Sequence, residues 1–283
     1  MYEAHFGFWE KPFSLSPDPA FLYMGEKHRM AYAMLEYGMR TEAPLVVISG
    51  EIGSGKTTLI RHLLNSAPKE TLVGLISNTH AAFGDLMQSI CLAFSLPFES
   101  ENKVALYNSF INFLIDGYGK GRRVLLVFDE AQNMDAAMLE ELRVLSNINA
   151  DKKFLLQIVL AGQPELRKTL RDPRLEQFAQ RVAVDYHLQA LDQRETKAYV
   201  AHRLLVAGGE PGLFSDAAVD LVHELSKGVP RIINTLCDTA LVYAFADEKH
   251  VVDEQLIRDF VREREERGLF GGGKLHYPAA GNE

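Results

Sequence analysis

One stretch of the sequence has the residue types and the spacing of a phosphate-binding loop. It matches the pattern G-x-x-x-x-G-K-[ST] at every fixed position and reads Gly50-Glu51-Ile52-Gly53-Ser54-Gly55-Lys56-Thr57. Glycines let successive backbone N–H groups point at anionic oxygens, and a helix that begins directly after the loop adds the positive end of its dipole. The pattern predicts that Lys56 binds the β- and γ-phosphates of a nucleotide and that the Thr57 hydroxyl ligates Mg²⁺.

A second candidate motif is an apolar run that ends in two carboxylates. Residues 124–128 are all apolar, and Asp129 and Glu130 follow directly, which is the Walker B pattern. We expect Asp129 to hold the hydration shell of Mg²⁺ and Glu130 to orient and polarise the attacking water. A small-molecule kinase would not need the second carboxylate, so the two motifs together favour hydrolysis of ATP. The Asn-Lys-x-Asp loop on which GTP specificity normally rests is absent from the sequence.

Further polar side chains follow the predicted strands. Gln163 ends the next apolar run, where it is expected to sense the γ-phosphate or the attacking water; the alternative is a turn residue before Pro164. Gln132 and Asn133, just beyond Glu130, are additional polar candidates.

Arginines matter because a guanidinium supplied by a neighbouring subunit can stabilise the charge of phosphoryl transfer. Arg171, Arg174 and Arg181 cluster before the last predicted strand. Arg181 is the preferred finger and Arg174 the second choice, with plain surface arginines as the alternative. Arg231, which follows Gly228-Val229-Pro230, is either a residue that reaches back to the γ-phosphate or an ordinary arginine at a helix start.

Strands and helices alternate over residues 41–190. Strands are expected at 45–49, 72–76, 124–128, 154–161 and, as an edge strand, 182–186, with helices at 57–64, 83–94, 106–117 and 136–148. Continuous apolar strands alternating with helices indicate an α/β domain with a parallel sheet covered on both faces.

After this domain the pattern is all-helical, over residues 191–267. Asp192 with Glu195 resembles a capping box, Ser215 and Asp253 stand at helix starts, and Pro230 suits a first turn. We therefore predict a small helical lid domain. The glycine-rich tail, 268–283, is expected to be disordered.

The first 40 residues are expected to form an arm and a helix that pack on the core. Residues 1–24 are rich in aromatic residues and in prolines, which exclude a regular helix there. We predict that this arm lays its rings on the domain that follows, and that a helix spans 27–40.

Composition narrows the class of protein. The chain has 283 residues with 47% hydrophobic and 24% charged residues, as in ordinary globular proteins, and its net charge of −8 is not that of a globally basic nucleic-acid binder. Cys91 and Cys237 are expected in the core rather than in a disulfide framework, and the histidines lack metal-ligand spacing. With neither an apolar run long enough to cross a bilayer nor a signal peptide, a cytoplasmic location is expected.

The motifs resemble those of the AAA+ ATPases, and more specifically of the ExeA/GspA-type secretion ATPases with their relatives at MSHA pilus and exosortase loci. The resemblance spans nearly the whole chain and is carried by Lys11-Pro12-Phe13, Ser16-Pro17-Asp18-Pro19, Gly50–Thr58, Asp129-Glu130-Ala131-Gln132, Leu160–Leu166, Gln180-Arg181, His202-Arg203-Leu204 and Gly228–Asn234.

The resemblance implies an ATPase core made by Lys56, Thr57, Asp129 and Glu130. It further implies Gln163 as sensor 1, Arg231 as sensor 2, and an arm near the adenine around Pro17–Pro19. ATP and Mg²⁺ are the implied cofactors.

The same resemblance implies a homo-oligomer that assists assembly of a secretion, pilus or exopolysaccharide/exosortase system. Larger ExeA members continue into a transmembrane helix and a peptidoglycan-binding domain. This chain stops after the ATPase, so we expect it to reach the inner membrane only through a partner. The rival reading is the related TniB/MuB type, an ATP-dependent scaffold on DNA, which the net charge disfavours. A third reading, a monomeric nucleotide switch, leaves Arg181 without a site in trans.

Overall fold

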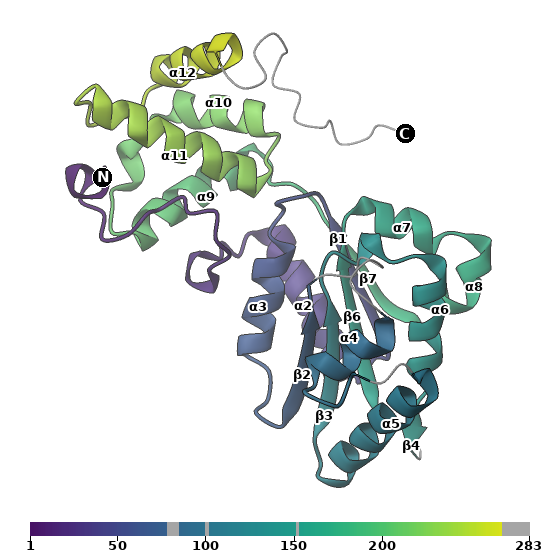
Figure 1. Cartoon of the computed structure of the whole chain (residues 1–283). Coiled ribbons are helices and arrows are strands. Elements are labelled where there is room, and N and C mark those ends of the chain that lie inside the picture. Colours follow the sequence, from purple (N-terminus) through teal and green to yellow (C-terminus); the bar gives the residue numbers. More distant parts are fainter. Residues whose placement is uncertain (78–84, 100–101, 151–152, 268–283) are drawn as a thin grey trace. The chain divides into compact units, whose positions relative to one another are not determined.

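The computed structural model describes residues 1–77, 85–99, 102–150 and 153–267 (Figure 1). The predicted disordered tail, 268–283, lies outside the described residues. The described chain divides into two compact units. One, the α/β unit, holds residues 28–50 and 56–188. The other, the helical unit, holds residues 1–27, 51–55 and the described residues from Gln189 onward.

The α/β unit is built on a five-stranded sheet in which every pairing is parallel, in the order β2-β3-β6-β1-β7. The strands are β1 (Leu45–Gly50), β2 (Thr71–Ile76), β3 (Arg123–Phe128), β6 (Leu156–Gly162) and β7 (Val182–Leu188). All residues of β1 and β6 are buried, as expected of inner strands covered on both faces. The predicted parallel α/β sheet, with its last strand at an edge, is confirmed.

Helices flank this sheet (Figure 1). They are α2 (Glu26–Arg40), α3 (Lys56–Asn65), α4 (Leu86–Ala93), α5 (Lys103–Gly119), α6 (Ala136–Leu145), α7 (Pro164–Leu170) and α8 (Glu176–Ala179). The apolar faces of α4, α5, α6, α7 and α8 share with the strands a core that includes Phe110, Phe128 and Phe178. The core also takes up Cys91, and burial raises the pKa of its thiol.

The segment between α6 and β6 differs from the prediction. Helix α6 ends at Leu145, three residues before its expected end, and the chain forms a short antiparallel pair, β4 (Asn149–Ala150) with β5 (Lys153–Phe154). The N–H of Leu155 then donates to the carbonyl of Ile148 at 3.0 Å, closing this hairpin. These hydrogen bonds use the backbone groups that a longer helix and an earlier β6 would need.

The helical unit contains α9 (Gln193–Val206), α10 (Asp216–Ser226), α11 (Pro230–Ala246) and α12 (Glu254–Arg267). The predicted capping box is confirmed, because Asp192 Oδ1 accepts from the Glu195 N–H at 2.8 Å and Glu195 Oε2 accepts from the Asp192 N–H at 3.1 Å. Ser215 and Asp253 cap α10 and α12 by accepting from backbone N–H groups. Cys237 is fully buried in this unit, as expected.

The N-terminal arm belongs to the helical unit, and the prediction that it packs on the α/β domain is wrong. Tyr2, Phe8, Phe13 and Phe21 are buried in the same core as the apolar residues of α9, α10 and α11. The short helices α1 (Glu3–Phe6) and η1 (Pro19–Phe21) interrupt the arm. Small helices leave apolar surface uncovered, and the aromatic rings of the arm bury it. Of the expected first domain, only residues 28–40 lie in the α/β unit.

Arg203 holds this arm in place. Its side chain is 7% exposed, and it donates to the carbonyls of Pro12 at 2.5 Å and Ser14 at 3.1 Å. Its guanidinium also lies over the ring of Phe21, 4.5 Å from the centroid. The planar fork of donors therefore joins α9 to two arm carbonyls that would otherwise lose their contact with water on burial.

Across the described ranges, no helix combines the length and the apolar character needed to span a membrane.

Candidate active site

The phosphate-binding loop connects an inner strand of the sheet to a helix. Strand β1 ends at Gly50 and α3 begins at Lys56. Gly53 and Gly55 have φ angles of 78° and 99°, in a region that favours glycine. Lys56 is only 7% exposed, and its Nζ donates to the carbonyl of Gly50 at 2.7 Å. Lys56 therefore presents a positive charge at the amino end of α3, next to the end of β1.

Thr57 and Asp129 come together beside this loop. The Thr57 hydroxyl, in the first turn of α3, donates to Asp129 Oδ2 at 2.7 Å, and Asp129 Oδ1 accepts from the N–H of Glu130 at 3.0 Å. Asp129 is 7% exposed and directly follows β3. One hydroxyl and one carboxylate fit Mg²⁺, which takes one or two protein oxygens and draws its other ligands from water and substrate phosphates.

Glu130 is held by two glutamine side chains. Its Oε2 accepts from Gln132 Nε2 at 2.6 Å and from Gln163 Nε2 at 3.2 Å. Gln132 Oε1 in turn accepts from the backbone N–H of Gln163 at 3.0 Å. The side-chain amide of Gln132 therefore links Glu130, the second residue after β3, to Gln163, the first residue after β6. Glu130 itself has a φ of 56°, an uncommon conformation for a non-glycine residue that is often found at functional sites.

Sheet register explains why these residues meet. Strands β3 and β6 are neighbours, with Phe128 level with Leu160, so the residues that follow both strands lie at the same carboxyl edge. Ligands bind at this edge in open parallel sheets. Gln163 was expected at the site from the sequence, and Gln132 and Asn133 were both additional candidates. In the structure Gln132 bonds to Glu130 and Gln163, whereas Asn133 is exposed.

Arg231 contacts the first half of the phosphate loop. Residues 51–55 group with the helical unit, and the N–H of Arg231 in the first turn of α11 donates to the carbonyl of Gly53 at 3.2 Å. A Cβ added to Gly53 would lie 2.3 Å from the Cβ of Arg231. Gly53 is therefore needed twice, for its positive φ and for this close approach.

The two candidate finger residues differ in their partners. Arg174 donates to Asp172 from Nε and from a terminal nitrogen, the latter at 2.6 Å, and these bonds lower the pKa of Asp172 to about 2. Arg181 has no carboxylate partner within the described part of the chain. It precedes β7, whose first residue, Val182, is level with Leu45 at the start of β1. Arg181 thus lies at the amino edge, at the opposite end of the sheet from Gly50.

The remaining predicted contacts to the nucleotide are spread over both units. Glu51 and the 53% exposed Ile52 lie in the loop, Ser54 is buried in it, and Thr58 follows Thr57 on α3. Pro17 is exposed on the arm of the helical unit. That Pro17 lies near the adenine of a bound nucleotide stays a prediction.

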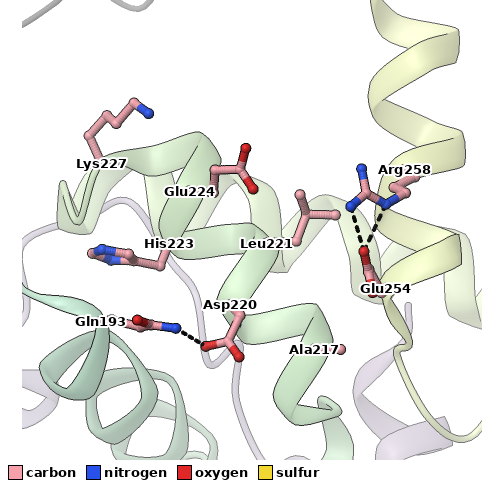
Figure 2. Close-up of a pocket in the computed structure, with 9 residues that line it drawn as sticks. All are labelled: Gln193, Ala217, Asp220, Leu221, His223, Glu224, Lys227, Glu254 and Arg258. Carbon is pink, nitrogen blue, oxygen red and sulfur yellow. Dashed lines mark hydrogen bonds and ion pairs between the residues drawn. The ribbon is translucent and has the colours of Figure 1, made fainter.

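A hollow in the helical unit is a less suitable site (Figure 2). Figure 2 shows Asp220 accepting from Gln193, at 2.7 Å, and Glu254 accepting twice from Arg258. Asp220 also pairs with Lys197 at 3.0 Å. These charges neutralise one another, so the hollow offers no surplus of positive charge for a phosphate.

Comparison with known proteins relates the chain to a family and to one curated relative. Residues 39–170 match the sequence profile of the AAA domain family. The chain is 43% identical over 253 residues to General secretion pathway protein A of Aeromonas hydrophila. The match covers 89% of this chain and 46% of that protein, so the chain spans about half the length of this curated relative.

Solved structures with a similar fold are more distant in sequence. The ORC2 protein of Aeropyrum pernix, solved as ADPNP–ADP complexes, superposes with a TM-score of 0.66 at 18% identity, over 90% of this chain and 72% of that one. The Thermotoga maritima RuvB branch migration motor gives 0.55 at 17%, over 87% and 72%. At these identities the likeness shows the fold alone, a P-loop sheet with a helical region after it.

Proposed function

Because this chain belongs to the AAA proteins related to General secretion pathway protein A, we propose that it binds ATP together with Mg²⁺ and hydrolyses it. The observation that carries this proposal is the meeting of Thr57 with Asp129 beside a Glu130 held by Gln163. When bound, Mg²⁺ supplies neutralisation of the charge on the β- and γ-phosphates.

Each residue of the site has a role in that reaction. When ATP binds, the buried ammonium of Lys56 would donate to phosphate oxygens instead of to the Gly50 carbonyl. Thr57 and Asp129 would hold the metal. Glu130 accepts a proton from the attacking water. The oxygen of that water bonds to the γ-phosphorus while the bond from the γ-phosphorus to the β–γ bridging oxygen breaks. Gln163 donates to the γ-phosphate or the water, and Arg231 reports the state of the nucleotide to the helical unit.

We further propose that the active form is a homo-oligomer in which Arg181 of one subunit acts on the nucleotide of the next. Arg181 lies at the far edge of the sheet from its own phosphate loop, and at an edge strand, so it is suited to a neighbour's site. A role in trans explains a half-buried arginine that has no carboxylate partner among the described residues better than a role in cis does.

The cellular role we propose is assistance to a secretion, pilus or exopolysaccharide/exosortase system on the cytoplasmic side of the inner membrane, through partner proteins. This role is supported by the 43% sequence identity to General secretion pathway protein A. The rival role, an ATP-dependent scaffold on DNA, has a distinct signature, because binding to nucleic-acid phosphates weakens steeply as salt is raised.

The experiment that tests the proposal is release of phosphate from ATP by the full chain, with and without Mg²⁺, beside ATP-dependent binding to duplex DNA over a series of salt concentrations. Mg²⁺-dependent hydrolysis without DNA binding supports the secretion role. ATP-dependent DNA binding with a steep salt slope favours the scaffold, and no nucleotide binding at all contradicts both.

A further inference from the structure

A second hollow lies in the α/β unit, at the amino edge of the sheet. We call it the amino-edge pocket; it has a volume of about 210 Å³ and is lined by Glu42, Tyr118, Arg122, Arg123, Lys153 and Phe154 together with Gly121, Val124, Leu155 and Gln157. Arg123 is the first residue of β3, whose other end leads into Asp129. The pocket and the candidate active site therefore occupy opposite ends of the same strand.

Positive charge dominates this pocket. Among the described residues that line it, three are cationic and Glu42 is the single carboxylate. Glu42 Oε1 lies 3.2 Å from Arg123 and 3.9 Å from Lys153. Arg122 has no carboxylate within salt-bridge distance among the described residues. A surplus of positive charge is thus collected in one hollow of a chain whose net charge is −8.

Glu42 is held in a backbone conformation that its side chain does not favour. Its φ is 56°, in the turn where Ala43 N–H donates to the carbonyl of Gly38 after the end of α2. This turn commonly takes glycine, and a residue with a Cβ is disfavoured there. The unfavourable residue nevertheless places a carboxylate between two cations, which marks where a carboxylate from outside would bind.

Apart from Gly121 and the buried amide of Gln157, which donates to the carbonyls of Gly38 and Met39, the rest of the lining is apolar. Leu155 and Val124 are buried beneath the pocket, and the rings of Tyr118 and Phe154 are each 37% exposed. A volume of about 210 Å³ is below the roughly 300–1,000 Å³ of pockets that enclose whole small-molecule ligands. It suits one or two side chains of a peptide.

We propose that the amino-edge pocket binds an acidic peptide segment of a partner protein, with a carboxylate between Arg122, Arg123 and Lys153 and an apolar side chain against Tyr118 and Phe154. A nucleic-acid strand fits less well, because its phosphates need cations spread along a track, whereas here the cations converge in one hollow. The proposal does not depend on ATP hydrolysis.

The test measures binding of a fluorescein-labelled peptide of alternating aspartate and phenylalanine to the full chain, by fluorescence anisotropy at low salt. The same peptide with asparagine in place of aspartate should bind about tenfold more weakly, since it cannot form ion pairs with the cations of the pocket. The double variant Arg122→Glu, Lys153→Glu should weaken binding of the aspartate peptide by about tenfold or more.

Two further variants separate the pocket from general charge and from misfolding. Lys69→Glu with Lys168→Glu makes the same change of charge at exposed sites elsewhere in the unit and should leave affinity within about twofold. Glu42→Gln removes the competing carboxylate and should tighten binding about threefold, a gain that an unfolded protein cannot give.

Other outcomes overturn the proposal. It fails if the native chain does not bind the aspartate peptide, or if the Arg122→Glu, Lys153→Glu variant binds it as the native chain does. It is also overturned if those substitutions leave the peptide bound but abolish binding of oligothymidine or of phosphatidylglycerol vesicles, which would make the pocket a site for phosphates.

Discussion

The hydroxyl of Thr57 donates to Asp129 Oδ2 at 2.7 Å, although Thr57 follows β1 and its loop whereas Asp129 follows β3, and these two strands are not neighbours. Strand β6 lies between β1 and β3, and its own end supplies Gln163. Three consecutive strands of the sheet therefore each deliver one part of the site. This arrangement predicts separable effects on nucleotide binding, on hydrolysis and on assembly.

The first prediction concerns nucleotide binding. Lys56→Ala removes a buried ammonium that would donate to phosphate oxygens, and a hydrogen bond to a charged group contributes about 1.5–3 kcal/mol. The dissociation constant for a fluorescent ATP analogue should rise roughly tenfold to 150-fold. Lys69→Ala, at an exposed lysine beyond α3, is the matched control. Unchanged affinity in Lys56→Ala would show that the loop does not bind the nucleotide.

The second prediction separates binding from chemistry. Glu130→Gln keeps the size and polarity of the side chain but cannot take a proton from water, so kcat should fall by about 10²–10⁴-fold while ATP still binds. The ATP-bound oligomer should then persist, as measured by light scattering after gel filtration in ATP. Hydrolysis at the native rate would remove Glu130 from the role of base.

The third prediction tests Gln132 as a positioning residue for Glu130. Gln132→Ala breaks the link from the Gln163 backbone to the Glu130 carboxylate, and kcat should fall about tenfold with KM unchanged. Asn133→Ala changes the adjacent, exposed amide and should retain native kinetics. Equal effects in the two variants would mean that the hydrogen bonds of Gln132 have no bearing on catalysis.

The fourth prediction uses mixed oligomers. Arg181→Ala should bind ATP but lose hydrolysis that depends on assembly, whereas Arg174→Ala should keep it because Asp172 already occupies that guanidinium. Mixing Arg181→Ala with Lys56→Ala should restore part of the activity, because a mixed interface joins an intact loop to an intact finger. If the mixture stays as inactive as its components, Arg181 does not act in trans.

The fifth prediction concerns the arm. Arg203→Ala leaves the buried carbonyls of Pro12 and Ser14 without this donor and should lower the free energy of unfolding by about 2–4 kcal/mol. Urea unfolding, with limited proteolysis of the arm, measures this. Arg203→Lys should be intermediate because it keeps the charge and loses the fork. Arg194→Ala, exposed on the same helix, is the control, and a loss in Arg203→Ala no larger than in the control would refute the role.

Most strands, motifs and helix caps of this protein could be predicted from its sequence, because they depend on local interactions. The strands, the glycine loop before Lys56, the acidic pair after β3 and the caps at Asp192 and Ser215 were all predicted, because each depends on residues that are near one another along the chain. Parallel strands also place their carboxyl ends at one edge, so the candidate site could be assembled before any coordinates were known.

Tertiary structure decided what depends on contacts between distant segments. The rings of the arm are equally apolar whichever unit they cover, and only the fold showed that Phe13 and Phe21 complete the helical unit, where Arg203 secures them. The sequence could not say which of Gln132 and Asn133 bonds to Glu130, or that Arg174 is paired and Arg181 is not. Those distinctions depend on where the partner residues lie in the folded chain. Composition and spacing specify which functional groups are present. Burial and hydrogen bonding, which exist only in the folded chain, determine which of these groups are positioned to act.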